Sequence, residues 1–300
     1  MDDPEDVDLP YQTLRKNLQE KYRTAFSSIA PLPWKKGYKL SLDQMFVERQ
    51  GHLIMKEQDT WRTHDQLIDV DAVSLIALSF HYCQDTQPII TVEGRMGSGK
   101  TTLCKRILMD WASEDIDIMD GICILYININ DVKDLKCCSE QDVCKLFGFP
   151  DNMDITNTWQ ILKKKQEDLL VFVDINKTQT SLDWLHTICN EFLPKAKFII
   201  YGRPDVLYKL TDISSVKILL QDFDHDKITK MLENLSVDYY IQDEIFDLMS
   251  EDESVGRLCT NPFLCTAFSV TCKEQNGVKC TDSALTCVRT FIAFIWKRFM

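Results

Sequence analysis

The 300-residue sequence lacks the excess of basic residues that a nucleic-acid-binding surface needs, because 34 lysines and arginines are set against 46 acids and the formal net charge is −12. Its one local basic run, 163–165, fits a solvated helix face. Its best apolar runs, 72–80 and 291–296, fall far short of the roughly 20 residues that span a bilayer. A signal peptide begins with a basic stretch, so from the acidic first residues we expect none. These absences predict a cytoplasmic globular protein that binds neither nucleic acid nor membrane.

Cysteine is well represented, with twelve residues. In a chain without a signal peptide, cysteines inside apolar runs are typical of reduced core residues. The cysteines of this kind are Cys123, Cys189, Cys265 and Cys287. Cys137-Cys138 and Cys144 come closest to a metal cluster, but neither a histidine nor a second close pair completes four ligands, so we expect no zinc.

One glycine-rich stretch has a spacing that suits phosphate binding. It matches G-x-x-x-x-G-K-[ST] from Gly94 to Thr101. Glycines let the backbone curl so that successive N–H groups point at phosphate oxygens. Lys100 would place its charge on the β- and γ-phosphates, and Thr101 would offer its hydroxyl to Mg²⁺. The residues predicted to hold the nucleotide are Gly94, Arg95, Met96, Gly97, Ser98, Gly99, Lys100, Thr101 and Thr102.

The residues around this motif support it. The β-branched apolar run 88–92 precedes it and predicts a buried strand. After it, Leu103, Ile107 and Trp111 recur at helical spacing. The N-terminus of that helix would direct its partial positive charge at the same phosphates. This order favours a P-loop over the alternative, a glycine-rich turn in an unrelated α/β protein.

Strands alternate with helices through the first two-thirds of the chain, which predicts a parallel sheet covered by helices on both faces. The predicted strands are 88–92, 122–129, 169–174, 198–201 and 216–220. From residue 224 the pattern is helical only. The predicted helices there are 224–235, 241–249, 262–272 and 285–299.

Two charged residues fall where a parallel sheet binds its ligands, beyond the carboxyl ends of the strands. Asp174 ends one predicted strand and could hold the water shell of Mg²⁺ opposite Thr101; the alternative is a turn or helix-capping aspartate. Arg203 follows the next strand and could reach a γ-phosphate, distinguishing ATP from ADP; the alternative is a surface arginine that caps its loop. We predict that both belong to one site with the P-loop.

Several segments together resemble the NACHT branch of the signal-transducing (STAND) P-loop ATPases, the nucleotide switch of NOD-like receptors. Residues 201–204, Tyr-Gly-Arg-Pro, resemble the family's Thr-Ser-Arg-Pro sensor, and residues 258–264 resemble the segment whose proline packs on adenine. The other similar segments are 31–34, 94–105, 110–112 and 220–223.

The resemblance implies a P-loop NTPase fold, a helical subdomain and the start of a truncated winged-helix region. The domains expected are an N-terminal helical extension (1–35), a linker or helical segment (36–85), the nucleotide-binding domain (86–222), the helical subdomain (223–281) and the start of the winged helix (282–300). It also implies binding of ATP or ADP with Mg²⁺ held by Thr101 and Asp174, catalytic roles for Asp174 and Arg203, and contact of Pro262 with adenine. Self-association in the ATP-bound state and a role in innate immunity follow from the same resemblance.

Two departures from the family's pattern matter. Where the family has Asp-Gly-Leu-Asp-Glu, residues 174–178 run Asp-Ile-Asn-Lys-Thr, so Lys177 and Thr178 replace the acids that orient the attacking water. The nearest substitute acids in sequence are Glu93 and Asp183. We therefore expect a slow ATPase at most. The resemblance further implies a winged helix and a repeat array after residue 300, so the sequence is expected to be a fragment or a truncated gene product.

Two functions of other classes remain as alternatives. In the first, the chain is a non-hydrolysing scaffold in which the nucleotide is structural, as the altered acidic motif allows. In the second, it is a small-molecule phosphotransferase, although neither an arginine-rich lid nor a second substrate pocket is evident. Residues 176–179, Asn-Lys-Thr-Gln, faintly resemble the guanine-binding motif of GTPases, but they lack its final acid and directly follow Asp174.

Overall fold

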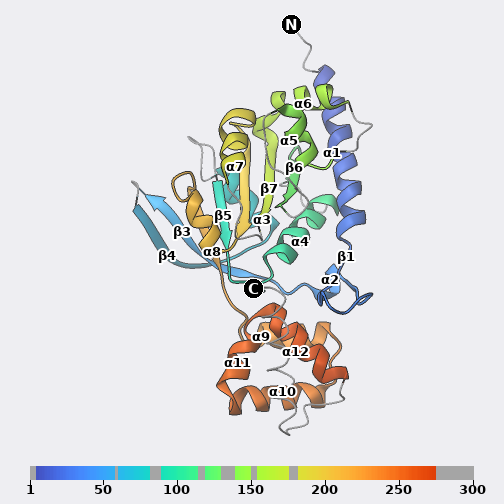
Figure 1. The fold of residues 1–300 in the computed structure, drawn as a ribbon, viewed down its shortest axis with the longest axis vertical. Helices are drawn as coiled ribbons and strands as arrows, with labels where there is room; N and C mark the ends of the chain where they lie inside the picture. Colours follow the sequence, from blue (N-terminus) through green and yellow to red (C-terminus); the bar gives the residue numbers. More distant parts are fainter. Residues whose placement is uncertain are drawn as a thin grey trace. The chain divides into compact units, whose positions relative to one another are not determined.

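The computed structural model describes residues 5–57, 60–81, 89–113, 119–129, 139–149, 154–175 and 182–274 (Figure 1). The predicted helix 285–299 and the predicted winged-helix region 282–300 lie outside this part. The strands are β1 (Ser28–Ile29), β2 (Leu40–Ser41), β3 (Gln50–Glu57), β4 (Thr60–Asp69), β5 (Ile89–Glu93), β6 (Cys123–Asn128), β7 (Leu169–Ile175), β8 (Lys197–Gly202) and β9 (Val216–Leu220). The helices are α1 (Glu5–Phe26), α2 (Leu42–Met45), α3 (Ala72–His81), α4 (Lys100–Ser113), α5 (Glu140–Leu146), α6 (Ile155–Lys164), α7 (Asp183–Thr187), α8 (Pro204–Leu207), α9 (His225–Asn234), α10 (Tyr239–Glu251), α11 (Glu253–Cys259) and α12 (Pro262–Glu274).

Among the described residues, seven strands form one sheet in the order β4-β3-β9-β5-β8-β7-β6. The strands from β9 to β6 run parallel to one another. Every residue of β5 and β7 is buried, as the continuous apolar runs predicted, because a parallel sheet is covered on both faces. The fold is therefore the expected mixed α/β architecture with a mostly parallel sheet.

The strands β3 and β4 differ from the sequence prediction, which had no strand in this region. They form an antiparallel hairpin, and β3 pairs with β9 in the antiparallel direction. Their residues are largely polar and half-exposed, so they lack the apolar run that marked the parallel strands. Because β3 runs opposite to β9, the beginning of β3 lies at the edge of the sheet where β9 ends.

The N-terminal helix α1 is built into the sheet-containing part of the molecule, where it packs against α4 (Figure 1). The ring of Tyr22 lies 5.8 Å from that of Trp111. Gln19 Nε2 donates to the carbonyl of Trp111 at 3.2 Å, and Arg23 Nε donates to that of Ala112 at 2.7 Å. These donors satisfy carbonyls of the last turn of α4, which have no partner within the helix.

The described residues divide into two compact units. The first holds 5–28 and Glu48–Gln221, with the whole seven-stranded sheet. The second holds Ile29–Val47 and 222–274, with α2 and α9 to α12. The predicted domain boundaries stay predictions. Among the described residues, no helix combines the length and apolar character needed to cross a bilayer.

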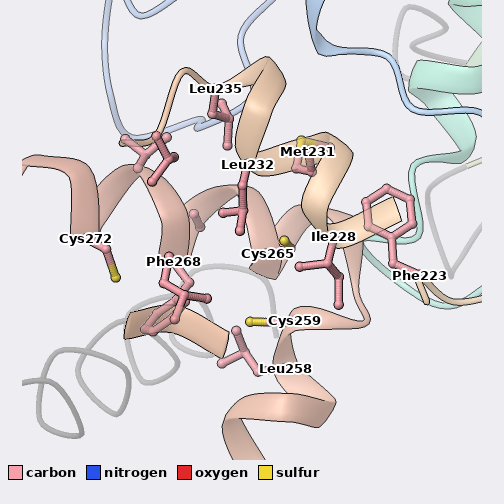
Figure 2. Packing of buried hydrophobic residues seen from close by; sticks show 14 of the residues in the cluster. Phe223, Ile228, Met231, Leu232, Leu235, Leu258, Cys259, Cys265, Phe268 and Cys272 are labelled. Carbon is pink, nitrogen blue, oxygen red and sulfur yellow. The ribbon is translucent and has the colours of Figure 1, made fainter. Parts of the chain in front are cut away.

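A helical core of its own holds the second unit together (Figure 2). Phe223, Ile228, Leu232 and Phe268 are among the buried side chains of this core. α11 was missed by the sequence prediction, because its seven residues are too short for a helical period to stand out. The cysteines that the structure describes are buried free thiols, as expected; they are Cys104, Cys123, Cys144, Cys189, Cys259, Cys265 and Cys272.

Candidate functional site

The predicted P-loop connects β5 to α4. Gly97 and Gly99 have φ angles of 80° and 84°, which residues other than glycine rarely adopt. At Gly94, an added Cβ would lie only 2.5 Å from the Ser98 Oγ atom, so the loop closes tightly on itself at this point. The tip of the loop, with Met96, is exposed. The loop is thus a small cradle of backbone whose shape depends on its glycines.

Lys100 begins α4 and folds back into this cradle. Its Nζ donates to the carbonyls of Gly94 and Arg95, both at 2.7 Å, and to Ser98 Oγ at 3.2 Å. The residue is only 9% exposed. Burial lowers the pKa of Lys100 from 10.5 to about 8; Asp174 opposes this, whereas Arg203 lowers the pKa further. A buried ammonium held by carbonyls is suited to move onto an anion that enters the loop.

The P-loop and β7 meet at one hydrogen bond. Thr101 Oγ1 donates to Asp174 Oδ2 at 2.7 Å, which joins residues 73 positions apart. Asp174 is 1% exposed. Burial raises its pKa, while the hydrogen bond from Thr101 and the charges of Lys100 and Lys105 lower it. A hydroxyl and a carboxylate in contact are the hard oxygen donors that Mg²⁺ prefers.

Arg203 follows β8, the strand between β5 and β7. Its Nε lies 3.5 Å from Asp205 Oδ1, and its side chain is 25% exposed. Its charge contributes to the lowered pKa of Lys100, so the two cations act on the same region of the molecule. Arg203 therefore lies in the same region as the P-loop lysine, with part of its surface open to solvent.

Arg49 is a charged residue of this region that the sequence did not reveal. It precedes β3, is buried, and donates from Nη2 to the carbonyl of Gln221 at 2.6 Å. Its charge also lowers the pKa of Lys100. Only a prediction of the antiparallel pairing of β3 with β9 could have placed it here.

Glu93 and Asp183, the substitute acids considered from the sequence, differ in their placement. Asp174 of β7 pairs with Tyr201 of β8, and Tyr201 pairs with Val92 of β5. Glu93 is the next residue of β5 and pairs with Gly202. Successive side chains of a strand point to opposite faces, so Glu93 lies on the face away from Asp174. Burial raises the pKa of Glu93, against the effects of Lys217 and Thr91. Asp183 is exposed in the first turn of α7.

Other predicted residues are placed less directly. Lys177 and Thr178 lie outside the described residues. Thr102 is half-buried in the first turn of α4. Pro262 is buried as the first residue of α12 in the second unit, and its contact with adenine stays a prediction.

The residues present fit a nucleoside phosphate with Mg²⁺. The cradle that a Cβ at Gly94 would fill, the buried ammonium of Lys100 and the start of α4 provide an anion site. In the part of the chain that the structure describes, no group of three or more His, Cys, Asp or Glu could hold a metal ion. This suits Mg²⁺ bound with a nucleotide, which is held by few protein ligands and keeps several waters and phosphate oxygens.

Comparison with known families matches this region. The model of the NACHT domain family matches residues 88–238, half of the chain. That range contains the P-loop, Asp174, Arg203 and helix α9 of the second unit.

Curated proteins similar to the chain include NACHT, LRR and PYD domains-containing protein 14 of Homo sapiens, 23% identical over 69% of this chain and 20% of that protein. Protein 4C of the same series, from Mus musculus, is 22% identical over 67% of this chain and 22% of its own length. NACHT, LRR and PYD domains-containing protein 3 of Bos taurus is 23% identical over 93% of this chain and 30% of its length. The chain thus spans less than a third of each of these relatives.

Proposed function

The chain belongs to the NACHT domain family, and we propose from its site that it is the ATP- and ADP-binding switch of a NOD-like-receptor-type signalling protein. In this proposal, bound ADP favours one conformation and ATP favours an open, self-associating one. A nucleotide can shift that equilibrium only by its differential affinity for the two states.

The observation that carries the proposal is the hydrogen bond between Thr101 and Asp174, at 2.7 Å. It brings the last residue of the P-loop motif to the acid at the carboxyl end of β7, across the intervening β8. A hydroxyl and a carboxylate in this relation to a phosphate cradle are the parts that position Mg²⁺ in P-loop NTPases. Mg²⁺ when bound would neutralise phosphate charge.

Each residue of the site has a proposed role. Gly94 to Thr102 enclose the phosphates, and Lys100 moves its ammonium from loop carbonyls to phosphate oxygens. Thr101 and Asp174 hold the cation. Arg203, whose charge lowers the pKa of Lys100, contacts the γ-phosphate and lets the site distinguish ATP from ADP.

We propose weak or absent hydrolysis. The residue after Asp174 is Ile175, fully buried and without a group that accepts a proton. Lys177 and Thr178 are poor replacements for carboxylates in sequence, and Glu93 lies on the opposite face of the sheet. The state of the switch would then depend on nucleotide exchange and on partners. A scaffold with permanently bound nucleotide is the second candidate, favoured by the same observations.

The remaining roles are those of a whole signalling protein, and the chain spans less than a third of the relatives that it matches. We propose that the protein acts in innate immune signalling in the cytoplasm. Its partners would be nucleotide, further copies of itself and a signalling protein; no nucleic acid or membrane partner is proposed.

Thermal unfolding in the presence of nucleotide tests the proposal. The purified chain should melt at a higher temperature with ADP or ATP, because a ligand at about 100 times its dissociation constant stabilises a protein by about 2.7 kcal/mol. Lys100→Ala should remove this increase. Lys163→Ala, which removes an exposed lysine paired with Glu140, should keep it.

A melting temperature that neither nucleotide changes in the unsubstituted protein would refute nucleotide binding. Rapid exchange of prebound ADP for ATP supports the switch. Nucleotide that stays bound for the life of the folded protein would favour the scaffold instead.

A further inference from the structure

Ser98 is a residue of the P-loop whose side chain lies inside the loop. The residue is 1% exposed, and its Oγ atom lies only 2.5 Å from the place that a Cβ at Gly94 would occupy. This oxygen accepts a hydrogen bond from Lys100 Nζ at 3.2 Å. The hydroxyl of Ser98 is therefore in direct contact with the ammonium that the proposed function assigns to the phosphates.

The ammonium of Lys100 has all of its protons engaged. An ammonium carries three protons and no lone pair. In the structure, Nζ of Lys100 donates to the carbonyls of Gly94 and Arg95, both at 2.7 Å, and to Ser98 Oγ at 3.2 Å. A phosphate oxygen can bind this ammonium only through one of the same three protons. Nucleotide binding therefore displaces one of the three acceptors or makes it share its proton.

Ser98 is the acceptor that a phosphate displaces most easily. Hydrogen bonds from nitrogen to oxygen range from about 2.7 to 3.2 Å, so the two carbonyl bonds lie at the short end and the Ser98 bond lies at the long end. A phosphate oxygen is also a stronger acceptor than a hydroxyl, because it is charged. The bond between Lys100 and Ser98 is thus the first to be replaced.

Replacing this bond lowers the net gain from binding. Both partners are buried, and a buried hydroxyl that loses its partner keeps the full cost of its own desolvation. The free energy needed to release the proton of Lys100 is subtracted from the free energy that the new phosphate contact provides. A loop without the hydroxyl at position 98 would not have this cost.

Resting on the proposed function, we propose that the side chain of Ser98 is a positioning residue that lowers the affinity of the P-loop for nucleotide, because it competes with the β-phosphate for a proton of Lys100. It acts through Lys100, whereas the backbone of Ser98 stays part of the loop that encloses the phosphates. ADP and ATP both carry the β-phosphate, so both are affected. Lower affinity acts mainly by speeding dissociation, which suits a switch whose state depends on exchange.

The test is Ser98→Ala in the 300-residue chain, which removes the hydroxyl. Two changes are expected that a loss of structure alone would not combine. Without nucleotide, the melting temperature should fall by about 2–4 °C, because a buried proton of Lys100 loses its acceptor. ADP with Mg²⁺ should nevertheless bind about 3- to 10-fold more tightly, and dissociate correspondingly more slowly, because no bond to Ser98 has to be replaced.

Ser139→Ala is the matched control. Ser139 caps α5, where its Oγ accepts from the backbone nitrogen of Asp142 at 3.2 Å. Loss of a helix cap lowers stability by a comparable amount. This variant should therefore melt at a lower temperature and bind ADP with unchanged affinity.

Ser98→Cys is a second variant of the loop. It keeps a side chain of similar shape, but sulfur is a weak acceptor and competes less for the proton of Lys100. It should therefore also bind ADP more tightly than the unsubstituted chain. If Ser98→Ala does not fold, this variant decides by the same criteria. Failure of both to fold would make the hydroxyl a requirement of the fold and would overturn the proposal.

Calorimetric titration with ADP and the dissociation rate of a fluorescent ADP analogue separate the remaining outcomes. Unchanged or weaker ADP binding in Ser98→Ala would overturn the role of Ser98 and leave the proposed function standing. The same follows if its melting temperature without nucleotide does not fall, or if Ser139→Ala binds ADP more tightly as well. Failure of the unsubstituted chain to bind ADP at all would overturn both proposals.

Discussion

Lys100→Met should make the nucleotide-free protein more stable, although it removes a residue central to nucleotide binding. Lys100 is buried, and burial lowers its pKa from 10.5 to about 8, so the folded state disfavours its charge. The difference between these values, at about 1.4 kcal/mol for each pH unit, corresponds to about 3 kcal/mol. Methionine leaves the carbonyls of Gly94 and Arg95 without the ammonium, which reduces the gain. We expect a net gain of about 1–3 kcal/mol at pH 7.

The dependence on pH provides an internal check. Below about pH 8, Lys100 is charged in the folded and unfolded states, and the full cost of burying the charge is present. Between about pH 8 and 10.5 the folded state releases the proton while the unfolded state keeps it, so the stability contributed by this group rises with pH. The advantage of Lys100→Met should therefore shrink as the pH rises. Groups that do not interact with Lys100 titrate equally in both proteins and cancel in the comparison.

Urea unfolding of nucleotide-free protein at pH 7 and pH 10 measures these differences. Lys163→Met, on the exposed face of α6, is the control and should change stability little at either pH. A Lys100→Met protein that is less stable at pH 7, or one whose difference from the unsubstituted protein is the same at both pH values, would refute the reasoning. In thermal unfolding with ADP, the nucleotide should raise the melting temperature of the unsubstituted chain and leave that of Lys100→Met unchanged.

Three further predictions concern the site. Arg203→Ala should weaken ATP far more than ADP, moving their affinity ratio by roughly 10- to 100-fold in paired titrations, since a charge-assisted hydrogen bond contributes about 1.5–3 kcal/mol; equal losses would make Arg203 structural. If the apolar surroundings of Pro262 bind adenine, displacement titrations should rank ATP and ADP above GTP and GDP, and a reversed order would contradict the adenine assignment. Single-turnover hydrolysis of labelled ATP should be about 10²–10⁴-fold slower than in ATPases with a general base; a fast rate that Asp174→Asn abolishes would show that Lys177 and Thr178 do not impair the motif.

The features that could be predicted from sequence are those with a local cause. The strand, loop and helix around Lys100 follow from adjacent patterns, and Asp174 lies at the end of a continuous apolar run. The carboxyl ends of parallel strands share one edge, so the sequence alone predicts that Thr101 and Asp174 lie close together, as their hydrogen bond confirms.

The features that could not be predicted depend on pairing between distant segments. β3 joins β9 across more than 150 residues, and neither its polarity nor its spacing indicates a partner. Arg49 is therefore absent from the sequence prediction. Register likewise decides that Tyr201 shares a face with Asp174 while Glu93 does not. If β7 were shifted by one residue, Asp174 would share a face with Glu93 instead of Tyr201.

The pairing of β3 with β9 also has a consequence for the second unit, which is built from two separate segments of the chain. Among the described residues, that unit takes its members from 29–47 and 222–274, on either side of a long insertion. The insertion begins and ends at neighbouring points, where Gln221 N donates to the Gln50 carbonyl at 2.8 Å and Arg49 donates to the Gln221 carbonyl. Bringing the two ends of a flexible loop together costs entropy that grows with the number of residues in the loop. Here the insertion is folded, and its sheet already holds its two ends together. The two segments of the helical unit are remote in sequence, but the pairing at Gln50 and Gln221 connects them much as a short turn would.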